Sequence, residues 1–442
     1  MSKKGASKTE KPRAVRRILF VVLALILAAA AFAGGWFGRY YSIDGRMRSL
    51  MWALDTLKKN YYEDLDEDAL YDDLFAALQV DPYTRFYTKA AYSKIQSESE
   101  GNNSDTGISV IEEDNVPVVY SVVGNSTASL AGLKKGMYIC AFGATAETAV
   151  KGNKAALIDF VAHHKGSFVL SCGYEKNGAD AKFYTVESTA YLGAYCIYRD
   201  SGGAYAYRGE DELTLTDITN TAEGVPALEG ADGRTAYLRI DQFDGRVAQE
   251  FVRLLAFMKE RGRDRLVLDL RGNGGGYLNY MASIASHLMK DAPLKRAVVA
   301  TAKYRDGGEE KFAVSMTDYS EYFGANSRIK VLADRDTASA SECLIGAMVE
   351  YGTVGYGDIY LRENEKGEAR TFGKGIMQSH FTDITGNVMK VTVATVHWPV
   401  TGKCIHGVGV TKEDGAVGVV ADELFLETND PMLSAALSAL SS

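Results

Sequence analysis

The sequence predicts a mixed α/β protein: an N-terminal transmembrane helix with a helical lead-in, a small β-rich module, and an α/β core with a partly parallel sheet. Three observations support this prediction. The chain has 442 residues, which is more than one typical domain. A run of twenty residues near the N-terminus carries no charge. From Arg234 onward, short apolar strands alternate with amphipathic helices, the pattern of a buried sheet covered by helices.

The transmembrane prediction rests on residues 1–38. Residues 1–17 hold seven basic residues and one acidic residue, which leaves 42 basic against 56 acidic residues, a net charge of −14, for the rest of the chain. The uncharged run within residues 18–38 is long enough to cross a hydrocarbon core of about 30 Å. Basic residues before the run predict a cytoplasmic tail at 1–17 and an extracytoplasmic body, anchored in the cell membrane by a single span. The alternative is a secreted protein, released by signal cleavage after Ala31-Phe32-Ala33.

Residues 39–98 are predicted as a helical N-terminal region. Apolar residues at helical spacing predict one helix over Met47–Tyr61 and a second, shorter helix that ends before Asp81-Pro82. The polar stretch Ser97–Thr106 is interpreted as a linker.

Residues 99–188 are predicted as a separate β-rich module. One amphipathic helix is expected over Asn153–His164, among five short strands. The strands are predicted at Ile108–Ile111, Val116–Val122, Met137–Ala141, Phe168–Gly173 and Ala181–Val186.

Within this module, Ser126–Met137 contains Ala131-Gly132-Leu133-Lys134-Lys135-Gly136 and resembles the AGL-x-x-G stretch of PDZ domains. An ordinary turn before a strand is the alternative interpretation. The resemblance implies that Gly107, Ile108 and Ser109 form a carboxylate-binding loop. Its backbone N–H groups would capture the C-terminus of a peptide that adds a strand to the sheet.

Residues 189–430 are predicted as the core, followed by a C-terminal tail at 431–442. Residues 190–230 show weak alternation and no recognisable chemistry. Strands and helices are then expected in alternation, ending in a hairpin. They are Tyr237–Ile240, Arg246–Arg261, Leu266–Leu270, Leu278–Met289, Ile329–Ala333, Ser339–Tyr351, Ile376–Ile384 and Val388–Trp398.

Three segments of the core carry candidate chemistry. The first, Asp269–Gly276, has a glycine run between a strand and a helix. Exposed backbone N–H groups in such a run suit an anion or an oxyanion, whereas a plain tight turn is the alternative. The run lacks the spacing of dinucleotide-binding and P-loop motifs.

The second segment is Asp336–Glu342, directly before an apolar helix. Ser339 and Glu342 have the spacing of a capping box, which is a purely structural interpretation. The functional interpretation makes Ser339 a nucleophile whose oxyanion is stabilised by the helix N-terminus and the N–H of Ala340. The local pattern leaves both open.

The third segment is Thr371–Gln378, in which Lys374 stands between two glycines. It is either a lysine in a surface turn or a buried general base whose pKa burial lowers. Histidine is the alternative base, but the six histidines form no recognisable pattern with a serine.

Composition excludes several other classes of protein. With 46% hydrophobic and 24% charged residues the chain is globular, and its net charge of −8 argues against a nucleic-acid partner. The five cysteines are widely spaced and odd in number, so we expect no disulfide framework and no metal site. No cofactor is expected.

Taken together, the segments from about Ser42 to Thr411 resemble the C-terminal processing peptidases, a family of carboxy-terminal, tail-specific serine proteases with a PDZ domain. Several motifs occur in the family's order. Besides the PDZ-like stretch they are Asp81–Thr88 (DPYTRFYT), Tyr237–Ile240 (YLRI), Leu268–Gly276 (LDLRGNGGG), Thr337–Glu342 (TASASE), Phe372–Gly375 (FGKG) and Gly402–Thr411 (GKCIHGVGVT).

The resemblance implies a serine endopeptidase that cleaves proteins near or from their C-termini with a Ser-Lys dyad. Ser339 would be the nucleophile, Lys374 the base and Gln378 the residue that orients the lysine. The N–H groups of Ala340 and Gly275 would form the oxyanion hole. A PDZ domain would bind the substrate's C-terminus and gate the site.

Some expectations remain open at this stage. Ser341 competes with Ser339 as the nucleophile. The segment 359–370 is interpreted as a charged hairpin insertion between Ser339 and Lys374. Substrates with free C-termini are the expected partners, with a homodimer and an activating protein as further possibilities. The alternative functions are a catalytically silent peptide-binding scaffold and, by fold analogy alone, a carrier of hydrophobic ligands.

Overall fold

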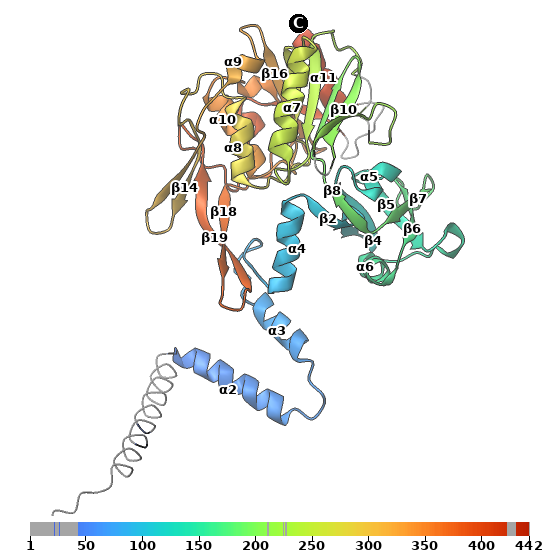
Figure 1. The fold of residues 1–442 in the computed structure, drawn as a ribbon, viewed down its shortest axis with the longest axis vertical. Helices are drawn as coiled ribbons and strands as arrows, with labels where there is room; N and C mark the ends of the chain where they lie inside the picture. Colours follow the sequence, from blue (N-terminus) through green and yellow to red (C-terminus); the bar gives the residue numbers. More distant parts are fainter. Residues whose placement is uncertain are drawn as a thin grey trace, which may run out of the picture. The chain divides into compact units, whose positions relative to one another are not determined.

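The computed structural model divides the chain into two compact units, residues 1–77 and 78–442, which are considered separately (Figure 1). The structure describes residues 22, 26, 43–209, 212–223, 225, 228–421 and 430–441.

The predicted tail at 1–17 lies outside the described residues, and so does the predicted anchor at 18–38 apart from Val22 and Ile26. Across the ranges that the structure does describe, no helix combines the length and the apolar character needed to cross a membrane. The membrane anchor therefore stays a prediction from the sequence.

The first unit contains α2 (Gly45–Asn60) and α3 (Glu67–Ala76), close to the two helices predicted there. Asp44 and Asp66 are their N-caps, because each carboxylate accepts a hydrogen bond from a backbone N–H in the first turn.

In the second unit, the β-rich module follows α4 (Lys89–Ser99). Its antiparallel sheet has the strand order β3-β4-β5-β6-β7. Leu133, Ile139, Phe168 and Leu170 belong to a hydrophobic core of its own. The bounds are β3 (Ile108–Glu113), β4 (Val116–Val122), α5 (Thr127–Ala131), β5 (Tyr138–Gly143), α6 (Lys154–His163), β6 (Ser167–Gly173) and β7 (Lys182–Glu187).

The stretch 97–106, predicted as a linker, instead contains the end of α4 and the strand β2 (Asn102–Asp105). This strand pairs antiparallel with β8 (Thr189–Leu192). The linker prediction was wrong because polar residues dominate a strand whose stability comes from backbone pairing.

The core is built on a sheet with the strand order β11-β10-β9-β12-β13-β16-β17-β20, counted over the described residues. The last five strands run parallel, whereas β9, β10 and β11 are antiparallel. The bounds are β9 (Cys196–Asp200), β10 (Gly203–Arg208), β11 (Thr214–Asp217), β12 (Thr235–Ile240), β13 (Arg265–Asp269), β16 (Arg328–Ala333), β17 (Ile359–Glu363) and β20 (Val417–Val420).

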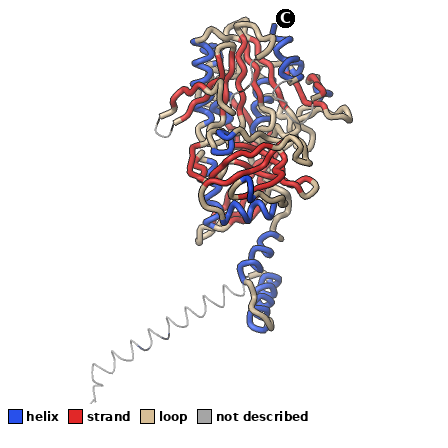
Figure 2. Tube along the Cα trace, turned by 90° about the vertical axis from the view of Figure 1, so that its right-hand side faces the viewer, coloured by secondary structure: helices blue, strands red, loops and turns tan. Residues whose placement is uncertain are grey.

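Helices cover both faces of this sheet, as Figures 1 and 2 show. Along β12, Ala236, Leu238 and Ile240 face the core formed with α7, α8 and α10. Tyr237 faces the opposite core, formed with α11. The helices are α7 (Val247–Glu260), α8 (Leu278–Ser286), α9 (Tyr319–Tyr322), α10 (Ala340–Glu350) and α11 (Pro431–Ser441), with short 3₁₀ turns at Ala146–Thr148, Tyr356–Asp358 and Lys412–Asp414.

A second sheet packs beside the first, with the order β1-β19-β14-β15 and with β18 paired to β19. The predicted hairpin is present as β18 and β19. The bounds are β1 (Arg85–Tyr87), β14 (Val298–Tyr304), β15 (Glu309–Ala313), β18 (Ile376–Thr382) and β19 (Val388–His397).

Three parts of the core differ from the prediction. Residues 190–230, to which no elements were assigned, contain β9, β10 and β11. The predicted tail at 431–442 is α11 through Ser441, and it buries Met432 and Leu437 against the sheet.

The third difference concerns the proposed insertion at 359–370. Its first residues form β17, an internal strand in which Ile359, Tyr360 and Leu361 are buried. Only the exposed turn around Asn364 and Gly367 projects from the fold. The insertion interpretation was therefore wrong for β17, because the charged residues that follow hid a short apolar strand.

The position of β17 predicts that Leu361→Ala destabilises the protein by about 2–5 kcal/mol, since it leaves a cavity in the hydrophobic core on one face of the sheet. Glu365→Ala, in the exposed turn, is the matched control and shifts stability by no more than about 0.5 kcal/mol. Urea denaturation of both variants measures the difference. Equal stabilities of the two variants would contradict the internal strand and favour an insertion that projects outward.

Candidate active site

Three loops bring the three candidate segments together. The Gly loop (residues 270–276) follows β13, the Ser339 loop (residues 334–339) follows β16, and the Lys374 loop (residues 371–375) precedes β18. Because β13 and β16 are parallel neighbours, their carboxyl ends share one edge of the sheet, where open α/β folds place their sites.

Asp334 and Asn273 join the first two loops. The buried Asp334 carboxylate accepts hydrogen bonds from the N–H of Gly272, at 3.0 Å, and from the N–H of Thr337, at 3.1 Å. The Asn273 carbonyl accepts the N–H of Ala338 at 3.0 Å. The Gly loop and the Ser339 loop are thus held as one unit.

Ser339 lies directly before α10, at the point where the Ser339 loop ends. Its backbone has φ 57° and ψ −114°, a strained conformation for a residue other than glycine. It makes no side-chain capping hydrogen bond to α10, and its hydroxyl has no hydrogen-bond partner among the described residues. The predicted capping box is present at its carboxylate side, because Glu342 accepts the Ser339 N–H at 2.9 Å, and this contact does not use the hydroxyl.

Ser341, the competing nucleophile, is fully buried. Its hydroxyl donates a hydrogen bond to the Asn273 carbonyl at 3.0 Å. Of the two serines, only Ser339 is partly exposed with an unengaged hydroxyl.

The two predicted oxyanion donors differ in their hydrogen bonding. The N–H of Ala340, the first residue of α10, has no acceptor among the described residues, whereas the N–H of Gly275 donates to Asn273 Oδ1 at 2.9 Å. Gly275 has φ 106°, and a Cβ there would lie 2.8 Å from the Ser339 Cβ. Gly275 therefore permits the Gly loop to approach Ser339 closely, with its own N–H already paired.

Glu342 links the Ser339 loop to the Lys374 loop. Its carboxylate, fully buried, accepts the backbone N–H groups of Ser339 at 2.9 Å, Gly373 at 2.8 Å and Lys374 at 2.9 Å. The Thr371 hydroxyl donates a further hydrogen bond at 2.5 Å. Burial raises the pKa of Glu342, and these hydrogen bonds oppose that rise.

Lys374 is half-buried beside this carboxylate. Burial, and secondly the charge of Lys390, lower its pKa, while Glu342 acts in the opposite direction. Its ammonium lies 4.5 Å from the ring centroid of Tyr83. Among the described residues it makes no hydrogen bond to Ser339 or to any other side chain.

Gln378, predicted to orient the lysine, lies on β18 opposite Thr392. Its amide donates to the Thr392 hydroxyl at 3.3 Å. The structure therefore brings Gln378 to the same sheet as Lys374 but shows no hydrogen bond between the two residues.

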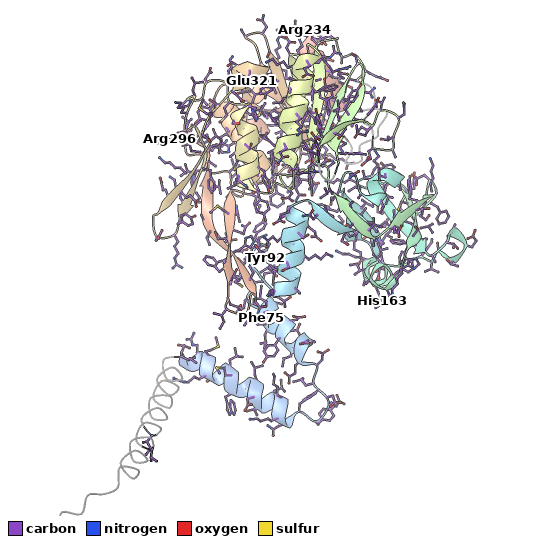
Figure 3. The ribbon with its side chains drawn as sticks, in the orientation of Figure 1. Phe75, Tyr92, His163, Arg234, Arg296 and Glu321 are labelled. Carbon is purple, nitrogen blue, oxygen red and sulfur yellow. The ribbon has the colours of Figure 1, made fainter. Side chains whose placement is uncertain are left out.

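The histidines make their contacts elsewhere. His380 packs on Tyr92 of α4, with ring centroids 5.1 Å apart (Figure 3 labels Tyr92). His397 bonds the Gly402 carbonyl at 2.8 Å. No hydrogen bond between the described residues joins a histidine to Ser339.

The predicted carboxylate-binding loop begins at Gly107, with φ 84°. A Cβ at this position would lie 2.0 Å from that of Ser126, so glycine is required. Its N–H donates to Asp105 at 2.7 Å. Ile108 and Ser109 start β3, which is an edge strand of the module sheet, and Ser109 shares a hydrogen bond with Ser121 at 2.5 Å.

Sequence reasoning missed a buried charge cluster below the Gly loop. Arg271 bonds the carboxylate of Asp269 and, from the segment before α11, that of Asp430. The Arg271 side chain is almost fully buried, with 4% of it exposed. The only signal in the sequence was an aspartate and an arginine flanking Leu270, which does not reveal the partner at Asp430.

The Cys404 thiol lies beside the Lys374 loop, with its Sγ 3.8 Å from the Gly375 carbonyl oxygen. Among the described residues, no group of three His, Cys, Asp or Glu side chains is arranged to hold a metal ion. All five cysteines are free thiols.

The chain is similar in sequence to known proteases. Residues 234–414 match the model of peptidase family S41. The chain is 24% identical to the carboxy-terminal processing protease CtpB of Bacillus subtilis over 371 residues, which cover 83% of this chain and 67% of that protein. It is 28% identical to the carboxyl-terminal-processing protease of Picosynechococcus over 330 residues, 73% of this chain and 67% of the other.

Two solved structures share the fold. The photosystem II D1 C-terminal processing protease superposes with a TM-score of 0.50 at 20% identity, covering 88% of this chain and 91% of its own. A putative S41 protease from Bacteroides fragilis gives 0.51 at 15% identity, covering 86% and 91%. The mixed α/β fold is thus that of S41 peptidases. The resemblance to carboxy-terminal processing proteases that the sequence predicted is confirmed by these similarities, with residues 234–414 matching peptidase family S41.

The contacts of Glu342 predict that Glu342→Gln lowers kcat/KM by about 100-fold. The amide of glutamine cannot accept all the hydrogen bonds that the carboxylate accepts, so the Ser339 loop and the Lys374 loop shift relative to each other. The control is Glu350→Gln on the same helix, where the carboxylate also accepts backbone N–H groups, from Val400 and Thr401. Peptide cleavage and thermal unfolding are measured for both. Equal losses of activity in the two variants would show that Glu342 has no special role.

Proposed function

We propose that the chain is a serine endopeptidase that cleaves proteins near or from their C-termini, with Ser339 as nucleophile and Lys374 as general base. The observation that carries the proposal is the Glu342 carboxylate, which fixes the backbone of both residues. A free hydroxyl in a strained turn before a helix and a lysine with a lowered pKa form the pair that acyl transfer needs.

In the proposed mechanism, neutral Lys374 removes the proton from the Ser339 hydroxyl as its oxygen attacks the scissile carbonyl. The free N–H of Ala340 and the positive end of α10 stabilise the resulting oxyanion. The lysine then gives its proton to the leaving amine, and water releases the acyl group by the reverse sequence. Every proton transfer uses side chains of this chain, so the scheme needs no cofactor.

The Ser339–Lys374 hydrogen bond is absent from the described structure, and catalytic contacts of this kind often tighten only with substrate. We propose that Gln378 releases Thr392 and orients the lysine in that state. Lys374 lies just before β18 and Gln378 lies near the start of that strand, which supports this role.

For substrate recognition, we propose that the β-rich module acts as a PDZ domain. Among the described residues, its edge strand β3 pairs with β4 alone and lies against α6, which leaves one side of the strand for an added peptide. Ile108 and Ser109 would supply the N–H groups that bind the peptide's C-terminal carboxylate.

We propose further that this module gates the site through the Ser339 loop. Lys135, in the turn before β5, forms an ion pair with Asp336. Lys135 also lies close to Gly272 of the Gly loop. We therefore propose that binding of a peptide C-terminus to the module is transmitted through the Lys135–Asp336 ion pair to the loop that carries Ser339.

Ser339→Ala is expected to lower cleavage of an unstructured protein by about a thousandfold or more, because the attacking oxygen is removed. Ser341→Ala is expected to retain most of the activity and to lose about 1 kcal/mol of stability with its buried hydrogen bond. Chromatographic analysis of the fragments compares the two variants. Activity in Ser339→Ala with loss in Ser341→Ala would refute the assignment, and an inactive wild type would favour the peptide-binding scaffold.

Lys135→Ala is expected to weaken coupling between the module and the site. The measurement is the ratio of kcat/KM for a peptide with a free C-terminus to that for the same peptide amidated, which should fall toward one. Lys176→Ala is the control, since Lys176 pairs with Asp114 inside the module. A ratio unchanged in Lys135→Ala would contradict this route for gating.

A further inference from the structure

The face of Tyr83 carries the ammonium of Lys374. The distance from Nζ to the ring centroid is 4.5 Å, well inside the range of about 6 Å over which the quadrupole of an aromatic ring attracts a cation. Both side chains are partly buried, so water screens the contact less than at an open surface. The contact joins the proposed base to the lead-in segment Asp81–Thr88. The proposed mechanism assigns no role to this segment.

Local hydrogen bonds hold Tyr83 in place. The Asp81 carboxylate accepts the backbone N–H groups of Tyr83 and Thr84, each at 2.7 Å, and the Thr84 hydroxyl at 2.9 Å. The same hydroxyl accepts the N–H of Thr392 on β19 at 3.2 Å. Tyr83 is thus anchored to the strand that pairs with β18, at whose start Lys374 stands.

The β1–β19 ladder adds a second anchor. Arg85, Phe86 and Tyr87 pair with β19 in continuous register. Because β19 also pairs with β18, the lead-in and the Lys374 loop are attached to one strand. The position of the ring relative to the lysine is therefore set by backbone pairing on both sides.

No carboxylate neutralises the Lys374 ammonium within the described residues. Burial, and secondly the charge of Lys390 on β19, lower the pKa of Lys374, whereas the Glu342 carboxylate, which accepts the backbone N–H of Lys374, acts to raise it. Arg85 in turn faces Lys390. The Tyr83 hydroxyl has no partner among the described residues, and burial raises its pKa, so the ring stays neutral.

We propose that Tyr83 is a positioning residue for Lys374, and that the face of its ring seats the ammonium formed when the lysine takes the proton of Ser339. This inference rests on the proposed Ser-Lys function. The ring, and not the hydroxyl, stabilises the ammonium, because the attraction comes from the aromatic face.

Two effects follow from the loss of the ring. The ammonium loses its stabilisation, so the pKa of Lys374 falls further. The acid limb of the kcat/KM profile is the pH range over which the lysine becomes neutral. This limb therefore moves to lower pH. The plateau above that limb also falls, because a weaker, less well seated base removes the serine proton more slowly. A residue needed only for folding would change the amount of active protein without moving the limb.

The test uses three variants of the full-length chain. Tyr83→Leu keeps an apolar side chain without a ring, and is expected to move the acid limb down by about 0.5–1 pH unit and to lower the plateau about 3–10-fold. Tyr83→Phe is expected to keep the wild-type profile. Tyr87→Leu is the matched control: it removes a tyrosine of β1 whose recorded ring contact is with Tyr92, and should not move the limb.

A second measurement does not depend on activity. In the Ser339→Ala background, competitive acetylation of Lys374 across a pH series, followed by peptide mass spectrometry, reports the lysine's pKa. A lower pKa in Tyr83→Leu than in Tyr83→Phe supports the inference. Identical pKa values and coincident rate profiles would overturn it while leaving the dyad intact. By contrast, cleavage that survives Lys374→Ala would overturn the proposed function itself.

Discussion

The candidate site depends on one buried carboxylate. Glu342 satisfies both of its oxygens with three backbone N–H groups and one hydroxyl, so that the cost of burying it is met by hydrogen bonds from two different loops. Because these donors include the N–H groups of Ser339 and Lys374, the same contacts that make the burial tolerable also fix the proposed nucleophile and the proposed base relative to each other. The strained backbone of Ser339 persists because the surrounding hydrogen bonds determine its position.

The sheet provides the frame on which this arrangement is built. Parallel pairing of β13 and β16 places the Gly loop and the Ser339 loop side by side, and Asp334 and Asn273 lock them together. On the other side, β19 carries both the Lys374 loop and the lead-in with Tyr83. Lys374, the proposed base, thus lies between these two parts of the fold, and a shift of either part changes its distance from Ser339.

Because strand and helix periodicity is local, the sequence alone predicted the strands of the β-rich module, the helices α7, α8 and α10 and the β18–β19 hairpin, and it singled out a serine and a lysine as candidate residues. The edges of α7 and β4 fall within about one residue of the predicted ones. Glu342 was read only as a capping residue: its bond to the Ser339 N–H follows from that pattern, but its bonds to Gly373 and Lys374 join segments distant in the sequence. The same reason hides Tyr83. The φ of Ser339 and the buried strand β17 were missed because neither backbone strain nor tertiary pairing has a local signature.

The central claim is that Ser339, activated by Lys374, forms an acyl-enzyme. It is tested most directly by mixing the protein with a peptide ester, quenching with acid within the first turnover, and locating the acyl group by peptide mass spectrometry. The account predicts one acyl group, on Ser339, in the wild type and none in Lys374→Ala. An acyl group on Ser341 or on a cysteine, or an adduct that forms equally well without Lys374, would contradict it.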